Sequence, residues 1–378
     1  MEIPFCIPWV SGKERSYLDR FLQDPAFSAS DGHFTKACVQ ALGEQLGLDN
    51  VLFTPSGTAA LELAAMITVR PGDEVIVPSY TFVTTVSSFV RAGAKPVFCD
   101  IRSDTQNIDD GQIEQLITDR TCAIVAVHYA GVGCAMSEIM RIADEHDLIV
   151  VEDAAQGLSG SYRNKALGGL GNLACFSFHY TKNYQCGEGG AIVVNDASLM
   201  ERAEICREKG TNRKAFDRGQ TDKYTWVDQG SSFLPSEISM AFLAGQLEDI
   251  DVVRLRRKAL YESYLSHLAP LENSGSIRLP IVPMECDPSY HMFYILAEDA
   301  ASRDALLEHL QSKGIGAVFH YVPLHSSPAG QALHDGRAMP VTEDHQGRIL
   351  RLPLYPDLKE EQVLQVCEAI LSFYGGDS

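Results

Sequence analysis

The sequence predicts an α/β fold with a mostly parallel, doubly wound sheet, helices on both faces and a small C-terminal α/β domain. Two observations lead to this expectation. Between residues 50 and 195, short runs that are apolar almost throughout alternate with Ala/Leu-rich or amphipathic helical patterns, as strands covered on both faces require. Beyond residue 275 the order becomes strand, helix, strand, helix, which indicates a second, smaller unit.

The expected strands matter for function because ligands of doubly wound sheets bind outside the carboxyl ends of the strands. Polar residues that directly follow an apolar run are therefore the ones to examine. In the large unit the expected strands are 74–78, 96–99, 123–128, 148–152, 175–178 and 191–194. In the small unit we expect strands at 291–296 and 317–321 and helices at 302–313 and 359–373.

The length of 378 residues exceeds what one hydrophobic core usually serves. We expect a large domain over residues 1–265 and a small domain over 266–378. The first 30 residues are able to pack on the small domain. Residues 196–270 read as mostly helical, interrupted by a polar stretch from 209 to 232.

The charge balance of 31 basic against 50 acidic side chains gives a net charge of −19, which argues against nucleic acid or an anionic membrane as a partner. The N-terminus has no basic stretch followed by an apolar run, and no segment approaches about 20 uninterrupted apolar residues. We expect a cytoplasmic protein.

Ten cysteines are spread along the chain without a C-x-x-C pair, as reduced thiols in a cytosol would be. Cys122, His128 and Cys134 are close in sequence, but their spacing matches no zinc pattern. We interpret them as packed residues of a strand and expect no metal site.

A possible anion site lies at the turn Ser56-Gly57-Thr58, which stands directly before an Ala/Leu-rich helix. Free backbone N–H groups and the helix dipole would point at an anion such as phosphate. The simpler interpretation, that Ser56 or Thr58 is only an N-cap, is about as good for this segment taken alone.

Two adjacent carboxylates, Glu152 and Asp153, end another buried run. Asp153 could hold a protonated ring nitrogen, because an adjacent anion raises the pKa of that nitrogen. A cap or turn role is the more common one for such an Asp.

Lys182 gives the sharpest signal, since it leaves a buried run and enters a turn that contains Gly187, Gly189 and Gly190. Partial desolvation would lower its pKa and free a neutral amine for Schiff-base formation. The ordinary alternative is a lysine whose ammonium reaches water.

The order of these pieces, with an aromatic residue at Phe82 between the first two, resembles the fold-type I pyridoxal phosphate (PLP) aminotransferases. Within them the chain is similar to the DegT/StrS family of sugar aminotransferases. The resemblance runs from Pro4 to near the C-terminus. Its segments are 71–78, 152–156, 177–183, 187–190 and 320–325.

The resemblance implies roles for individual residues around PLP, which alternates with pyridoxamine phosphate. Lys182 would carry the cofactor as a Schiff base and Asp153 would pair with its ring nitrogen. Gln156 would sit by the ring hydroxyl and Phe82 would stack on the ring. The phosphate contacts would come from Ser56, Gly57, Thr58, Ser177 and, from the neighbouring subunit of a homodimer, Ser232. Many relatives have an Asn at this last position, so the shorter Ser232 is a departure.

The segments 128–131, 178–184, 209–213, 222–226 and 230–232 most resemble dTDP-4-amino-4,6-dideoxygalactose transaminases. That resemblance implies transfer of an amino group from glutamate to the 4-keto carbon of dTDP-4-keto-6-deoxyglucose, giving dTDP-4-amino-4,6-dideoxy-D-galactose. A different nucleotide keto-sugar, 3-keto or UDP-linked, stays open.

Basic residues gather between positions 207 and 223 and could attract the diphosphate of such a substrate, with Tyr224 and Trp226 near its base or sugar. A solvated loop is an equally good interpretation of each one. The cluster is Arg207, Lys209, Arg213, Lys214, Arg218 and Lys223. From the small domain His320, Tyr321 and His325 could reach the sugar, although one histidine could equally serve the core or a turn.

Three other functions are possible for a chain of this fold. A PLP-dependent sugar dehydratase would have a histidine in place of Lys182. A non-catalytic ligand sensor of the same fold is disfavoured by the Ser56, Asp153 and Lys182 set and by the lack of an added DNA-binding segment. A nicotinamide enzyme would need a G-x-G-x-x-G after the first strand, and none is present.

Overall fold

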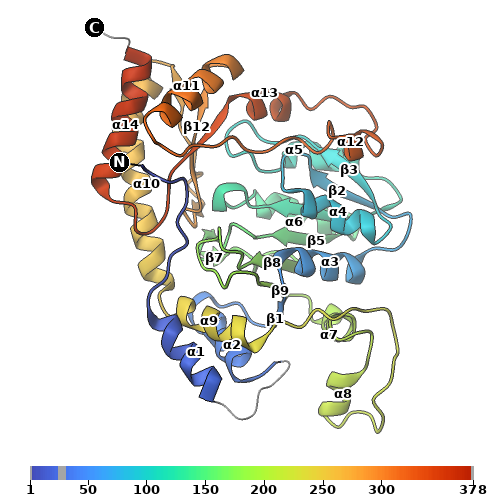
Figure 1. The fold of residues 1–378 in the computed structure, drawn as a ribbon. Coiled ribbons are helices and arrows are strands. Elements are labelled where there is room, and N and C mark those ends of the chain that lie inside the picture. Colours follow the sequence, from blue (N-terminus) through green and yellow to red (C-terminus); the bar gives the residue numbers. More distant parts are fainter. Residues whose placement is uncertain (1, 24–30, 376–378) are drawn as a thin grey trace.

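Residues 2–23 and 31–375 are described by the computed structural model of the chain, in which a seven-stranded sheet lies at the centre (Figure 1). Its order is β1-β9-β8-β5-β4-β2-β3. All neighbours from β8 to β3 are parallel, whereas β9 is antiparallel to both β8 and β1. The strands are β1 (Val51–Thr54), β2 (Glu74–Pro78), β3 (Lys95–Cys99), β4 (Thr121–Val127), β5 (Ile149–Asp153), β8 (Leu173–Ser177) and β9 (Gly190–Val194).

Helices cover both faces of this sheet, which confirms the predicted α/β class. Because side chains alternate along a strand, Val75 and Val77 pack in one cluster with α3, α4 and α7, while Ile76 packs in another with α5 and α6. A further cluster joins β1, β8 and β9 to α2 and α9. The helices are α2 (His33–Leu46), α3 (Gly57–Thr68), α4 (Val83–Arg91), α5 (Asp110–Ile113), α6 (Met136–His146), α7 (Met200–Arg207) and α9 (Glu237–Leu247).

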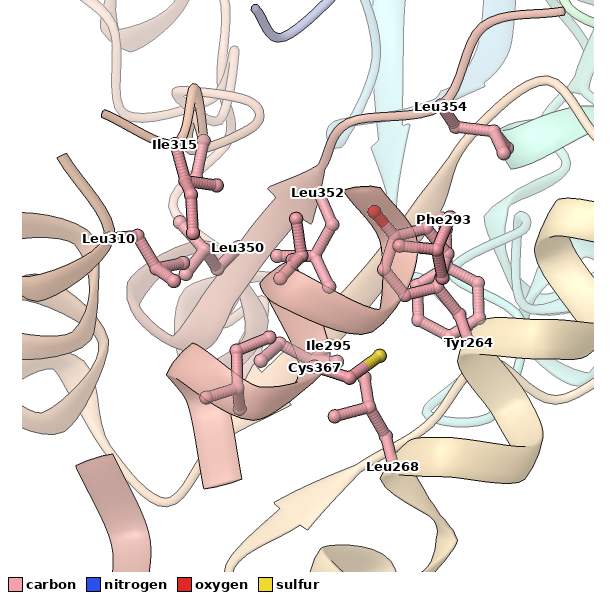
Figure 2. Close-up of a cluster of buried hydrophobic side chains, with 14 of the residues drawn as sticks. Tyr264, Leu268, Phe293, Ile295, Leu310, Ile315, Leu350, Leu352, Leu354 and Cys367 are labelled. Carbon is pink, nitrogen blue, oxygen red and sulfur yellow. The ribbon is translucent and has the colours of Figure 1, made fainter. Parts of the chain in front are cut away.

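The C-terminal unit is an antiparallel sheet in the order β10-β12-β13 with helices packed on it. Figure 2 shows Tyr264 and Leu268 beside Phe293, Ile295 and residues of the last strand and helix in one apolar cluster. The elements are β10 (Ile277–Arg278), β12 (Phe293–Ala297), β13 (Ile349–Leu352), α10 (Ile250–Asn273), α11 (Ala300–Ser312), α13 (Pro340–Arg348) and α14 (Glu360–Gly375).

One expected strand of the small unit is wrong. Residues 317–321 form only an isolated bridge between Val318 and Arg351, and the strand beside β12 is β13. The physical reason is that the chain leaves the sheet after Val318 and places His320 and Tyr321 at a cavity between the two units. The apolar pattern of residues 317–321 therefore marks a crossing segment.

The N-terminal segment and α10 connect the two units. Ile3 pairs with the small unit through the Ile3 N–H to Gly314 O and the Gly316 N–H to Ile3 O, at 2.9 and 2.7 Å, whereas α1 (Lys13–Gln23) packs on α9. Residue 265, where we divide the chain, lies inside α10, so this helix belongs to both parts. The division at that residue stays a prediction.

Residues 208–232 form an arm, which contains α8 (Arg213–Asp217) and projects from the body of the molecule in Figure 1. The Asn212 side chain stabilises the arm by accepting a 2.8 Å hydrogen bond from the Thr225 N–H.

Within the two described ranges, no helix combines the length and apolar character needed to cross a membrane. Further short elements are β6 (Ser161–Tyr162), β7 (Lys165–Ala166), β11 (Cys286–Asp287) and α12 (Pro328–Gln331).

Candidate active site

A cavity of about 660 Å³ opens at the carboxyl ends of β4, β5 and β8, with the small unit forming its other wall. This is where a doubly wound sheet places its ligands. The cavity brings together ten of the residues predicted from the sequence, and leaves four others outside it. Those inside are Ser56, Gly57, Thr58, Phe82, Asp153, Gln156, Ser177, Lys182, His320 and Tyr321.

The N-terminus of α3 forms an anion cradle on the large-domain wall. Ser56 has extended backbone angles and its Oγ accepts the Ala59 N–H at 3.1 Å, so the N-cap role of Ser56 is real. The N–H groups of Gly57 and Thr58 belong to the first turn, which has no acceptor within the helix. A Cβ on Gly57 would lie 2.8 Å from the Ser177 Cβ; only glycine leaves the cradle open.

Glu152 and Asp153 end β5 and differ in their surroundings. Glu152 is buried in the protein, where its carboxylate accepts hydrogen bonds from His128 at 2.8 Å and from the backbone N–H groups of residues 168, 170 and 171. Asp153 lines the cavity, and its two oxygens accept the Thr85 hydroxyl at 2.7 Å and the Ala155 N–H at 3.1 Å. Thr81 lies 2.9 Å behind Thr85.

Asp153 is 5% exposed and forms no ion pair with any residue in the described parts of the chain. A buried carboxylate without a cationic partner is costly. Its position at the cavity wall therefore fits a cationic ligand atom such as a protonated ring nitrogen.

Lys182 occupies a turn closed by backbone hydrogen bonds, including its own N–H to His179 O at 2.8 Å. Burial lowers the pKa of Lys182 to about 8, although the nearby charge of Asp153 opposes this shift. Lys182 lines the cavity, and within residues 2–23 and 31–375 its amine has no hydrogen-bond or ion-pair partner. Neutral amine is therefore available for carbonyl chemistry near neutral pH.

Gln156 and Phe82 complete the large-domain wall. The Gln156 amide is fixed by accepting the Ala130 N–H at 2.8 Å and donating to the Tyr321 hydroxyl at 3.2 Å. The Phe82 ring is 55% exposed and lies 6.4 Å from the Tyr321 ring. An exposed aromatic side chain at a cavity mouth is free to cover a planar ligand.

The small-domain wall contains residues that sequence reasoning missed. His320 and Tyr321 were expected here, and the His320 Nδ1 lies 3.0 Å from the Tyr129 hydroxyl. His291 and Arg351 were not expected, and neither was Phe5 from the N-terminal segment. No motif marks them, because each stands alone in an apolar run or a terminal segment and reaches the cavity only through the tertiary fold.

Four predicted residues lie outside this cavity within the single chain. Ser232, Arg213 and Tyr224 are exposed residues of the arm. His325 is 5% exposed and its Nδ1 lies 2.6 Å from the Ser79 hydroxyl. The structure thus gives His325 a packed position.

The basic cluster of the arm is largely paired within the chain. Arg207 is almost fully buried and donates to Phe53 O and to Asp31, which Lys214 also contacts. Arg218 pairs with Glu204 at 2.6 Å and Arg213 lies 3.7 Å from Glu208. The prediction that Arg207 attracts a diphosphate is therefore wrong, because its guanidinium already donates its hydrogen bonds to Asp31 and Phe53 O.

An open anion cradle, a buried carboxylate that lacks a cation and a lysine with a lowered pKa match the phosphate, ring nitrogen and aldehyde of PLP. Together with the fold they define a PLP-dependent transferase.

The model of the DegT/DnrJ/EryC1/StrS aminotransferase family matches residues 11–371, and the chain belongs to this family of PLP-dependent sugar aminotransferases. A dTDP-3-amino-3,4,6-trideoxy-alpha-D-glucose transaminase of Streptomyces venezuelae is 35% identical over 356 residues, covering 93% of this chain and 88% of that protein.

Solved structures agree with this assignment. The structure of S. venezuelae DesV in complex with a ketimine intermediate has a TM-score of 0.90 at 32% identity, with 100% of both chains covered. That of Helicobacter pylori PseC, an aminotransferase involved in the biosynthesis of pseudoaminic acid, has a TM-score of 0.90 at 26% identity and covers 99% of this chain and 100% of that one. The chain is thus a sugar aminotransferase of this family.

Proposed function

We propose that the enzyme transfers an amino group from glutamate to the 4-keto carbon of a dTDP-4-keto-6-deoxyhexose, giving dTDP-4-amino-4,6-dideoxy-D-galactose. The observation that supports this most is the convergence of Lys182 and Asp153 on one cavity that His320 and Tyr321 also line. The choice of the 4-keto sugar rests on the resemblance of segments such as 178–184 and 209–213.

The residues around the cavity suggest how the reaction would be assisted. Bound PLP supplies an electron sink that stabilises negative charge on the carbon next to the reacting nitrogen. Lys182 Nζ would take the proton from the α-carbon of the amino donor and later return a proton to the sugar carbon, because its low pKa leaves part of it neutral. General acid–base transfer of this kind contributes about 10²–10⁴-fold.

Asp153 would hold the proton on the ring nitrogen, and Thr85 would keep that carboxylate in place through its 2.7 Å hydrogen bond. Ser56, Gly57, Thr58 and Ser177 would bind the phosphate, whose charge suits the N-terminus of α3. The Tyr321 hydroxyl, fixed by Gln156, would close the small-domain side and help exclude water.

We further propose that two copies of the chain form a homodimer with the active site at their interface. The projecting arm exposes apolar side chains that a monomer would leave in water: Trp226 is 78% exposed, and Tyr224 and Val227 are each 50% exposed. Large exposed apolar groups gathered on one surface favour a protein interface. Such an arm could carry Ser232, Arg213 and Tyr224 to the partner's cavity.

A second candidate substrate is a 3-keto sugar, favoured by the name of the 35% identical relative. The test is to incubate the holoenzyme and glutamate separately with dTDP-4-keto-6-deoxyglucose and with its 3-keto isomer, and to analyse the products by NMR. The proposal expects amination at C4 with the configuration of galactose. Preferential amination at C3, or the glucose configuration at C4, would contradict it.

A further inference from the structure

His291 is a buried residue of the cavity wall to which the proposed reaction assigns no role. It stands two residues before β12, is 7% exposed and lines the cavity together with Lys182. Both side chains also line a second space of about 10 Å³. A space of that size holds about one water molecule, so the two side chains are close neighbours.

A chain of hydrogen bonds fixes which nitrogen of His291 carries the proton. The Asn183 amide nitrogen donates to Ser289 O at 2.9 Å, so the amide oxygen of Asn183 faces the ring. That oxygen lies 3.0 Å from His291 Nδ1, and an amide oxygen only accepts hydrogen bonds. Nδ1 therefore carries the proton, and the neutral ring has a lone pair on Nε2.

The surroundings of His291 keep its ring neutral. Burial holds the pKa of His291 well below its usual range, and neighbouring groups act in the same direction. These groups are Lys182, Arg257, Arg351 and His320. Nε2 is therefore an acceptor at neutral pH, and within residues 2–23 and 31–375 it has no hydrogen-bond partner.

The amine of Lys182 needs an acceptor of this kind. In the proposed reaction Lys182 takes up a proton and is an ammonium between two proton transfers, in a cavity that Arg351 also lines. The two carboxylates that line the cavity are engaged elsewhere, because Asp153 serves the ring nitrogen and Glu188 lies 3.7 Å from His179. A lone pair on a neutral ring accepts a hydrogen bond from the ammonium without taking its proton.

We propose that His291 is a positioning residue whose Nε2 accepts a hydrogen bond from the Lys182 amine while that amine is free of the cofactor. The inference rests on the proposed role of Lys182 in proton transfer. Asn183 directly follows Lys182 and contacts the ring, so the acceptor is tied to the turn that carries the lysine. The flexible stem of a lysine allows its amine to reach a neighbouring acceptor.

Two substitutions separate the acceptor on Nε2 from the contact to Asn183. His291→Asn places an amide N–H near the position of Nδ1, which keeps that contact, but has no atom at the position of Nε2. His291→Gln places an amide near the position of Nε2, and its oxygen supplies the lost acceptor. The control is His309→Asn, because His309 of α11 lies 3.1 Å from Ala369 O and does not line the cavity.

The first measurement is stopped-flow absorbance of the holoenzyme, which follows the half-reactions with glutamate and with the keto-sugar separately. His291→Asn is expected to lower the maximal rate of both about 10- to 100-fold, as the loss of one hydrogen bond to a charged group would. The half-saturating concentrations of both substrates should not change. His291→Gln should recover most of the loss, and His309→Asn should change neither rate.

The second measurement uses the full chain freed of PLP and needs no turnover. With labelled histidine, nitrogen NMR should show a protonated Nδ1 and a bare Nε2 on His291 at neutral pH. The Nε2 signal should shift as Lys182 titrates near pH 8. In His291→Asn the pKa of Lys182, measured as the midpoint pH of PLP capture, should fall because the ammonium has lost its acceptor.

Three outcomes would overturn the proposal. If His291→Asn behaved like the unaltered enzyme while His291→Gln was impaired, the ring would serve only the contact to Asn183. A raised half-saturating concentration of one substrate at an unchanged maximal rate would assign the ring to that substrate. A pKa of Lys182 that rises in His291→Asn would show that the ring only excludes water.

The proposed function is tested apart from this inference. An enzyme that shows the expected effects with glutamate but aminates no 4-keto sugar would contradict the proposed function and leave the role of His291 intact.

Discussion

The two walls of the cavity differ in how their polar groups are satisfied. On the large-domain wall, Asp153 is fixed by hydrogen bonds from the Thr85 hydroxyl and the Ala155 N–H. Gln156 is fixed by a hydrogen bond from the Ala130 N–H. On the small-domain wall, the Arg351 guanidinium has no hydrogen-bond or ion-pair partner in the described residues, and burial holds the pKa of His320 well below its usual range. Side chains held in place by hydrogen bonds suit a cofactor that stays bound. Polar side chains without protein partners suit two substrates that bind one after the other.

Asp153→Asn gives the largest expected effect on the fixed wall. A neutral amide would no longer favour the protonated ring nitrogen, so turnover should fall by about 10²–10³-fold while PLP still binds. Steady-state kinetics and the absorbance spectrum measure this.

Asp109→Asn is the matched control for this substitution. Asp109 caps α5 through the Gly111 N–H, and Asn caps helices as well as Asp, so kinetics should not change. If the Asp153→Asn enzyme kept normal turnover, Asp153 would not be the residue that keeps the cofactor's ring nitrogen protonated.

Gly57→Ala tests whether the cradle at α3 binds the phosphate. The added Cβ would lie 2.8 Å from the Ser177 Cβ, and overpacking of this kind costs about 1–3 kcal/mol. The dissociation constant for PLP, measured by titration of the apoenzyme, should rise roughly 10-fold or more by that principle.

For comparison, Gly43→Ala in α2 meets its nearest atom at an ordinary 3.4 Å. This change should leave PLP affinity unaltered and stabilise the helix slightly. If both variants bound PLP equally well, the phosphate would lie elsewhere.

Tyr321→Phe tests whether a residue of the small-domain wall serves the sugar or the cofactor. It removes the hydroxyl that Gln156 contacts at 3.2 Å, at the position that faces the sugar in our proposal. Loss of one such hydrogen bond should lower kcat/KM of the sugar half-reaction about 5–10-fold, while PLP affinity changes less than about 2-fold. A variant that lost PLP affinity instead would place Tyr321 with the fixed wall.

The smallest effect concerns pH. Because burial lowers the pKa of Lys182 to about 8, about one tenth of the amine is neutral at pH 7. The rate at which apoenzyme captures PLP should therefore rise with pH, reach half its maximum near pH 8 and then level. Stopped-flow absorbance measures this rate; a midpoint near pH 10 would show a solvated lysine.

The sequence predicts the large-domain wall better than the small-domain wall, and the reason is topological. Asp153, Ser177 and Lys182 stand at or just after the ends of parallel strands, whose carboxyl ends must meet at one edge of the sheet. Arg351 and His291 reach the cavity only because two units pack together, and no local pattern records that packing. The apolar residues of segment 317–321 predict a strand, but in the structure this segment crosses between the two units.

The same distinction explains the arm and the first strand. Charges between 207 and 223 look free in the sequence, but acidic partners outside that stretch, Asp31 far along the chain and Glu204 close by, neutralise several of them. Strand β1 was not among the expected strands because its four residues carry little periodic signal.

The attachment of the cofactor to Lys182 is the claim on which both walls depend. Reduction of the holoenzyme with borohydride makes a Schiff base permanent, and peptide mass spectrometry then locates the modified side chain. Our account predicts a single pyridoxyl group on the peptide that contains Lys182. The same group on any other lysine, with Lys182 unmodified, would contradict it.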